Sequence, residues 1–142
     1  MENYISTSKE QGIKFYQTFN DKGKLVMLNL LRFRKIADYS GYKELEPANE
    51  ISGAEAYDLY IQHTITHLKE VDAKVLFFGD AGRFLIGPGN EHWDAVLLVE
   101  HQSVQQFLQF AKNEDYLKGA GHRTAALEDS RLLPMTQRGV ES

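Results

Sequence analysis

Hydrophobic residues recur along this chain with two different spacings. Apolar side chains at three- and four-residue intervals predict helices, most clearly from Ala54 to Leu68. A hydroxyl residue followed three positions later by Glu or Gln is the capping-box pattern of a helix start. The three expected starts are Thr7-Ser8-Lys9-Glu10, Ser52-Gly53-Ala54-Glu55 and Ser103-Val104-Gln105-Gln106. The first helix is expected to reach about Asn20, and a short helical turn is expected around 115–118.

Runs of branched and aromatic side chains between these helices predict strands. The expected strands are 24–34, 74–78, 83–86, 94–101 and a last one within 127–135. Gly79-Asp80-Ala81-Gly82 has the composition of a hairpin turn between two of them. The stretch 35–51 has no clean period, so we expect a long connection there, and long loops in compact domains are often functional.

The order of these elements predicts the fold class. Without the N-terminal helix and the short strand 83–86, it is β-α-β-β-α-β, the split βαβ arrangement of ferredoxin-like α+β proteins, with an antiparallel sheet. We therefore expect a single domain over 1–142, made of an N-terminal helical extension (1–23), a ferredoxin-like core (24–134) and a C-terminal tail (135–142).

Two of the expected strands are apolar on both faces. A sheet that helices cover on one side only should alternate apolar and polar residues, yet Leu25–Leu31 is interrupted only by Asn29, and Ala95–Val99 is not interrupted at all. Something must cover the second face. A second copy of the chain is the economical cover, which predicts a homodimer formed sheet against sheet. The alternative is that the N-terminal helix and the long loop cover that face within one chain.

Several segments resemble a known family. They are Asn29–Arg34, Asp38–Tyr42, Ser52–Tyr57, Trp93–Val99 and Gly121–Arg131, and the resemblance spans about residues 24 to 134. The family is an uncharacterised group of dimeric α/β-barrel proteins, the domain-of-unknown-function family numbered thirteen-thirty. The resemblance implies a ferredoxin-like protomer whose sheet faces that of a partner. Relatives with this architecture include cofactor-independent monooxygenases, muconolactone-type isomerases and haem-handling enzymes, but the family has no agreed catalytic residues to carry over.

Composition excludes several classes of function. The 142 residues include 16 Lys and Arg against 20 Asp and Glu, so we expect no nucleic-acid partner, which would need a basic surface. The chain has no cysteine, which excludes disulfides, thiolate metal sites and a cysteine nucleophile. It has no apolar run long enough for a bilayer and no signal-like start, which predicts a cytoplasmic protein without a membrane partner. Phosphate-binding loops and nucleophile elbows are missing as well, and we expect no cofactor.

The candidate catalytic residues are His122 and Arg123, which follow Gly119-Ala120-Gly121. A histidine in a loop can act as a general base near pH 7, and a neighbouring arginine can hold an anion. The alternative is a loop histidine with satisfied hydrogen bonds and a salt bridge from Arg123 to Glu128 or Asp129.

The candidate ligand-binding residues are Asn29, Arg32, Tyr42, Tyr60 and Trp93. Asn29 is a lone amide in an apolar strand, able to orient a ligand or to make a structural hydrogen bond. Arg32 could clamp a carboxylate or pair with acidic residues nearby. The three aromatic side chains offer flat surface to a planar ligand, with Tyr60 off the main apolar stripe of its helix.

Metal binding is not expected. His63 and His67 are four residues apart, within reach of one ion, but Thr64 stands where a zincin motif has its glutamate. The sequence therefore predicts a small-molecule-binding protein, with cofactor-independent oxidation (an oxidase or monooxygenase) or isomerisation of a small planar or acidic compound as its chemistry. The alternative is a non-catalytic dimeric module that binds a ligand or a partner protein.

Overall fold

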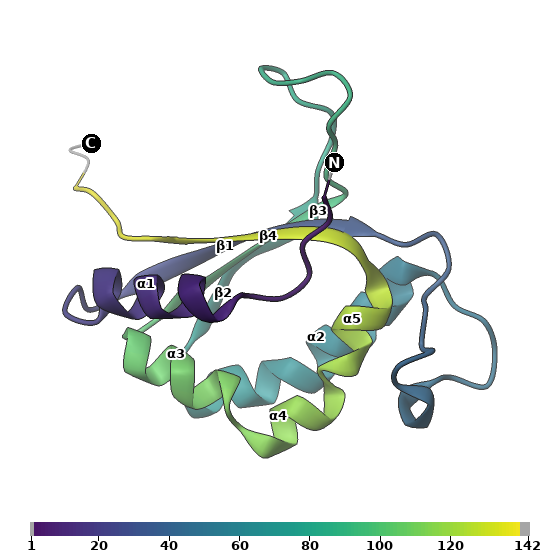
Figure 1. The fold of residues 1–142 in the computed structure, drawn as a ribbon, viewed down its shortest axis with the longest axis horizontal. Helices are drawn as coiled ribbons and strands as arrows, with labels where there is room; N and C mark the ends of the chain where they lie inside the picture. Colours follow the sequence, from purple (N-terminus) through teal and green to yellow (C-terminus); the bar gives the residue numbers. More distant parts are fainter. Residues whose placement is uncertain (1, 140–142) are drawn as a thin grey trace.

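A computed structural model describes residues 2–139 of the chain (Figure 1). Met1, the first residue of the predicted extension, and residues 140–142 of the predicted tail lie outside the described residues. The elements in chain order are α1 (Lys9–Phe19), β1 (Leu25–Phe33), the 3-10 turn η1 (Lys43–Leu45), α2 (Gly53–Glu70), β2 (Lys74–Asp80), β3 (Ala95–His101), α3 (Val104–Ala111), α4 (Glu114–Gly119), α5 (Gly121–Ala126) and β4 (Leu127–Met135).

The four strands form one antiparallel sheet in the order β2-β3-β1-β4. Helix α2 connects β1 to β2, and α3, α4 and α5 connect β3 to β4, so the chain has the split βαβ order of a ferredoxin-like fold. Figure 1 shows α2 to α5 on one side of the sheet. The predicted α+β class and antiparallel sheet are confirmed.

Serine side chains begin the three predicted helices. Ser52 accepts a hydrogen bond from the backbone N–H of Glu55, whose carboxylate accepts from the backbone N–H of Ser52, so the predicted capping box is present. Ser103 likewise accepts from the N–H of Gln106 at the start of α3. The first helix begins one residue later than predicted, with its capping box at Ser8 and Gln11 instead of Thr7 and Glu10.

Three local predictions are wrong. Residues 83–86 form no strand and residues 79–82 form no hairpin turn, because β2 runs through Gly79 to Asp80 and residues 81–94 leave the sheet as a long loop. We call this loop the arm; in Figure 1 it rises from the sheet on the side away from the helices. The segment that begins at Gly121 is helix α5, not a loop, because Ala120 keeps a helical backbone with φ −65° and ψ −21° between α4 and α5.

The side of the sheet that faces the helices carries the core. On β3 the odd-numbered residues from Ala95 to His101 are buried and the even-numbered ones only partly so. On β1 Leu25, Met27 and Leu31 are likewise buried. Phe15 and Phe19 of α1 pack against Leu25 and Met27, so α1 lies on this same side. The alternative in which the N-terminal helix covers the second face is therefore wrong.

We call the second side the open face. Because paired residues of antiparallel strands share a face, it is formed mainly by apolar side chains of all four strands. They are Val26, Leu28, Leu30, Phe77, Val96, Leu98, Leu133 and Met135. Among residues 2–139, no helix is long and apolar enough to cross a membrane.

Candidate functional site

The seven predicted site residues lie in three different places. Arg123, Tyr60 and Asn29 point into the layer between the sheet and the helices. His122 and Tyr42 lie on another side of α5, beside the long loop 35–51. Arg32 and Trp93 lie on the open face at the base of the arm.

Arg123 projects from α5 toward β4. Its Nη1 donates to the backbone carbonyl of Ile5 at 2.7 Å, and its Nη2 donates to the hydroxyl of Ser130 at 3.3 Å. Within the described part of the chain it has no acidic partner: the predicted alternative, a salt bridge to Glu128 or Asp129, is absent. Asp129 is instead held by Arg131 at 2.7 Å. Arg123 is thus a partly buried guanidinium without a counter-ion.

Buried tyrosines lie near this guanidinium. Tyr60 of α2 and Tyr116 of α4 share a hydrogen bond of 2.7 Å between their hydroxyls, and the ring of Tyr57 lies 5.2 Å from that of Tyr60. Burial raises the pKa of both Tyr57 and Tyr60, and the charge of Arg123 is near enough to oppose part of each rise. Both hydroxyls are therefore neutral hydrogen-bond donors at physiological pH.

The prediction that Tyr60 lies off the main apolar stripe of its helix is wrong. Its side chain is only 7% exposed. Helix α2 is covered by the sheet and also by α4 and α5, so its buried stripe is wider than one helix packed on one sheet would need. Tyr60 consequently faces the interior, beside Tyr116.

Asn29 lies on the same side of the sheet as this group. Its side-chain nitrogen donates to the carbonyl of Leu97 at 3.2 Å and, more weakly, to that of Met27 at 3.4 Å. These are structural hydrogen bonds, the alternative to ligand binding that the sequence allowed. They use only the side-chain nitrogen, so the side-chain oxygen of Asn29 can still accept from a ligand. Leu31 pairs with Ser130 across β1 and β4, so Asn29 is a diagonal neighbour of the serine that holds Arg123.

His122 does not share the site of Arg123. Consecutive helical residues point about 100° apart, and His122 faces the long loop, where its Nδ1 and the Tyr39 hydroxyl are 2.7 Å apart. Burial and the nearby charge of His63 lower the pKa of His122. A Cβ at Gly121 would lie 2.5 Å from the Tyr42 ring, so this glycine lets Tyr42 pack directly on α5. A cavity of about 310 Å³ lies under the loop, lined by Tyr39 and by residues 36–37 and 46–51.

Arg32 and Trp93 meet on the open face. The guanidinium carbons of Arg32 and Arg131 lie 4.8 and 5.0 Å from the centre of the buried Trp93 ring, and Asp129 is 3.7 Å from Arg32. Arg32 also donates two hydrogen bonds, of 3.1 and 2.8 Å, to the carbonyl of His92. Arg32 therefore anchors the arm to the sheet and pairs with Asp129. The sequence allowed this pairing with a nearby acidic residue as the alternative to ligand binding.

Neither Asp129 nor Arg131 was among the predicted site residues. Burial alone would raise the pKa of Asp129, but hydrogen bonds from the Tyr4 N–H, Arg131 and the Ser130 N–H hold that pKa below its usual value. In the sequence the two residues are two positions apart in the expected last strand, a signal that they share one face. That signal does not say which arginine Asp129 pairs with.

His63 and His67, considered above as a metal-binding pair, each make a hydrogen bond to another residue instead. The rings of His63 and His67 lie 5.2 Å apart, but His63 Nε2 bonds to the backbone oxygen of Asp115 at 2.8 Å, and His67 Nδ1 bonds to Glu70 at 2.6 Å. In the described residues 2–139, no group of three or more His, Asp or Glu side chains could hold a metal ion.

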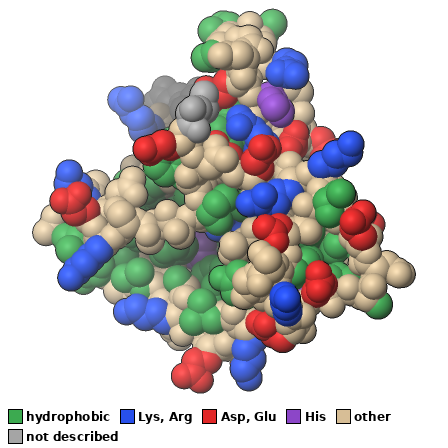
Figure 2. Space-filling view, turned by 45° about the vertical axis from the view of Figure 1, so that its right-hand side comes forward, with side chains coloured by type: hydrophobic (Ala, Val, Ile, Leu, Met, Phe, Trp, Pro, Cys, Tyr) green, Lys and Arg blue, Asp and Glu red, His purple; other side chains and the backbone are tan. Residues whose placement is uncertain are grey.

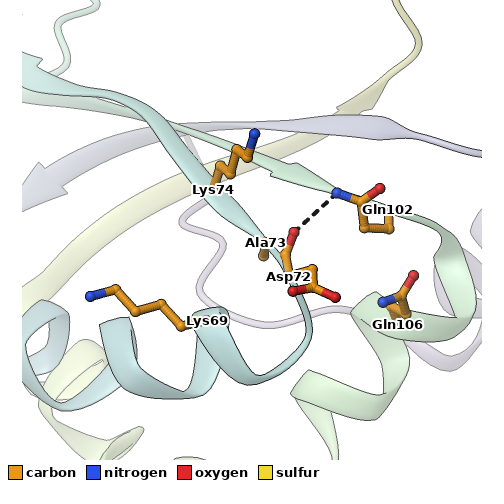
Figure 3. Close-up of a pocket in the computed structure, with 6 residues that line it drawn as sticks. All are labelled: Lys69, Asp72, Ala73, Lys74, Gln102 and Gln106. Carbon is orange, nitrogen blue, oxygen red and sulfur yellow. Dashed lines mark hydrogen bonds between the residues drawn. The ribbon is translucent and has the colours of Figure 1, made fainter.

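A larger groove, of about 630 Å³, lies at the end of the sheet where β2 begins and β3 ends (Figure 3). It contains none of the predicted residues, being lined by Lys69, Asp72, Ala73, Lys74, Gln102 and Gln106. Figure 3 shows Gln102 reaching toward the loop after α2, where it donates to the Asp72 carbonyl at 3.1 Å. With no aromatic side chain in its walls, this groove lacks the flat surface expected around a planar ligand.

Comparison with known proteins finds relatives of unknown function. No family model and no curated protein matches the chain, so the resemblance to family thirteen-thirty stays a prediction. A crystal structure of the RPA0582 protein of Rhodopseudomonas palustris, a protein of unknown function, is 33% identical, with 98% of this chain and 100% of that chain covered and a TM-score of 0.86. A structure of the methylated RPA0582 protein is 34% identical over 98% of both chains, with a TM-score of 0.85. An uncharacterised NIPSNAP-like domain protein of Burkholderia xenovorans shares only the fold, with 11% identity, coverage of 84% and 90%, and a TM-score of 0.51.

Proposed function

The chain belongs to the same family as the RPA0582 protein of Rhodopseudomonas palustris, and we propose that it is a homodimeric protein that binds a small organic anion between its sheet and its helices. One observation carries this proposal. Arg123 is partly buried, and no carboxylate among the described residues compensates its charge. A guanidinium held away from water without a counter-ion is costly, and a bound carboxylate would remove that cost through two parallel hydrogen bonds.

The surroundings of Arg123 specify the kind of anion. One of the Tyr60 and Tyr116 hydroxyls donates to the other, so one of this pair, together with the Tyr57 hydroxyl, can donate to a ligand. The three rings offer flat apolar contact. Asn29 adds an acceptor on the sheet side. A small acid with a flat, apolar body matches this combination, in line with the planar or acidic compound predicted from the sequence.

The N-terminal segment regulates access to Arg123 in this proposal. The Ile5 carbonyl takes one of the guanidinium hydrogen bonds, and the Tyr4 carbonyl accepts from the Ser130 hydroxyl at 2.6 Å. An incoming carboxylate competes with the Ile5 carbonyl for Arg123. Because a carboxylate is the stronger acceptor for a guanidinium, binding displaces the segment around Ile5.

The homodimer of this proposal forms through the open face. Phe77 and Leu133 remain 52% and 54% exposed there, beside partly exposed side chains of β1 and β3. Soluble monomers rarely leave a contiguous apolar patch of more than a few hundred Å² in water. A second copy facing the first would give the dimeric α/β barrel that the sequence predicts.

Isomerisation is the second candidate function, and the Tyr39–His122 pair favours it. The lowered pKa keeps His122 neutral near pH 7, and the Tyr39 hydroxyl, 2.7 Å from its Nδ1, fixes its ring. Tyr39 itself lines the loop cavity. A neutral imidazole held in this way can take a proton from one carbon of a ligand and return it to another. His122→Gln would abolish such a proton exchange and leave anion binding at Arg123 unchanged.

Calorimetric titration of the purified protein with benzoate and phenylacetate, and with their neutral amides, tests anion binding. Wild type should prefer each acid to its amide. Arg123→Gln should weaken acid binding at least tenfold, since a charge-assisted hydrogen bond contributes about 1.5–3 kcal/mol. Arg34→Gln is the matched control, because Arg34 is exposed near the end of β1. Equal acid binding by wild type and Arg123→Gln, or no preference for acids over amides, would refute the proposal.

A further inference from the structure

The apex of the arm carries two apolar side chains that are almost fully in water. Leu85 is 98% exposed and Ile86 is 92% exposed, more than any other large hydrophobic residue within 2–139. Figure 2 shows hydrophobic side chains on this projecting end of the molecule. Turn and loop positions usually carry Gly, Pro, Asn, Asp or Ser, so two adjacent aliphatic residues at an apex require an explanation.

The base of the arm is firmly attached to the sheet. Arg32 donates two hydrogen bonds to the His92 carbonyl, and the buried Trp93 ring is covered by guanidinium groups. The Asp94 N–H donates to the Leu31 carbonyl at 2.7 Å, and the Phe33 N–H donates to the Asp94 carboxylate at 2.8 Å. The arm therefore leaves the sheet in a fixed direction.

The apex has its own internal packing. Gly87 has φ +156°, and a Cβ there would lie 2.8 Å from the Phe84 ring, so the ring folds over the glycine backbone. Leu85 and Ile86 lie between these two residues in the sequence, and both stay almost fully in water. A built turn that exposes two aliphatic side chains has the form of a docking element.

We propose that Leu85 and Ile86 dock on a second copy of this chain and clasp the dimer. The arm rises on the side of the sheet opposite the helices, which is the side of the open face (Figure 1). A partner seated on the open face would therefore lie beside the arm. By symmetry, the arm of the partner would hold the first copy in the same way, as a two-fold interface requires.

The available area supports a second copy as the occupant. Leu85, Ile86, Phe77 and Leu133 together amount to about three fully exposed large side chains, or roughly 450–600 Å² per copy at about 150–200 Å² each, and the partly exposed side chains of β1 and β3 add to this. A standard stable interface buries about 800 Å² per partner. Without Leu85 and Ile86 the open face alone falls well short of this value, so the clasp supplies a large part of the interface.

The clasp rests on the proposed dimer, and one experiment separates the two. Sedimentation equilibrium gives the dimer dissociation constant of wild type, of the double variant Leu85→Ser/Ile86→Ser, and of the control Ile13→Ser/Leu117→Ser. The control residues are 48% and 52% exposed on α1 and α4, in the helical layer. The arm variant should dissociate at least a hundredfold more readily than wild type, and the control should not change. A dimeric arm variant of unchanged affinity would refute the clasp and leave the sheet-to-sheet dimer standing, whereas a monomeric wild type would refute both.

A fluorescent label gives an independent measurement on the assembled protein. The chain has no cysteine, so Leu85→Cys carries a single thiol for an environment-sensitive dye. The emission should shift to the blue at concentrations where the protein is dimeric, and return to the solvent value on dilution to the monomer. An emission that stays at the solvent value in the dimer would show that the apex touches no partner, and would overturn the clasp.

Discussion

His101 should make the fold sensitive to mild acid. It is the last residue of β3, only 2% exposed, and its ring lies 5.0 Å from that of Phe107 and 5.9 Å from that of Phe110. Within residues 2–139 its Nδ1 has no hydrogen-bond partner. Burial lowers its pKa from the usual 6.5 to about 4, so the folded protein holds this imidazole neutral.

The direction of the pH effect on the free energy of unfolding follows from proton binding in the folded and unfolded states. Between pH 6.5 and about 4 the unfolded chain binds a proton at His101 and the folded protein does not, so the free energy of unfolding falls as the pH falls through this window. Through His101, the free energy of unfolding falls by about 1.4 kcal/mol at pH 5.5 and by about 3 kcal/mol at pH 4. His122 adds a loss of the same sign, because its pKa is also lowered.

Urea unfolding at pH 7.5 and pH 5.5 measures the effect. At pH 5.5 the carboxyls of Asp38, Glu55 and Asp129, whose pKa values are lowered in the fold, are still ionised in both states and do not interfere. His101→Gln should lose most of the difference between the two pH values, whereas His92→Gln, a change in the arm, should keep it. If His101→Gln shows the same difference as wild type, the buried neutral imidazole is not the cause of the acid sensitivity.

Two further changes test the packing around the candidate site. A Cβ in Gly53→Ala would collide with the backbone oxygen of Arg34 and lie 2.6 Å from that of Ala126. Neither backbone atom can move aside cheaply, so we expect a loss of about 3 kcal/mol and a fall in Tm of roughly 10 °C by calorimetry. Tyr60→Phe removes the hydroxyl bonded to Tyr116 and should cost about 1 kcal/mol in urea unfolding, and a cost near zero would mean that this hydrogen bond contributes nothing.

Local signals were enough to predict most of the fold. The capping box at Ser52 lies where expected, and the last strand occupies Leu127–Met135, the range within which it was expected. Such signals act over a few residues, so the sequence displays them directly. The segment 83–86 shows their limit: its composition is that of a strand, but a strand also needs a neighbour to pair with, and no strand of residues 2–139 pairs with the arm.

The glycines before His122 misled the prediction for a different reason. Gly119 and Gly121 suggested a loop, because glycine weakens a helix. In the structure each lies where a side chain would strike an aromatic ring, that of His63 or that of Tyr42. Close packing from distant segments decides these two positions, and the sequence around them contains no sign of it. The helix that results turns His122 and Arg123 toward different surroundings.

The candidate anion site depends on which of the arginines near β4 pairs with the Asp129 carboxylate. Arg32, Arg123 and Arg131 all lie within reach of this strand, and Asp129 is the one buried carboxylate there among the described residues. Asp129 lies on the open face, because it is the register partner of Arg32 across β1 and β4 and is two residues from Arg131. Ser130 lies on the other face, and its hydroxyl accepts a hydrogen bond from Arg123. A shift of one residue in the register of β4 would exchange these faces and give Arg123 its counter-ion, so the register of the sheet leaves this arginine free for a ligand.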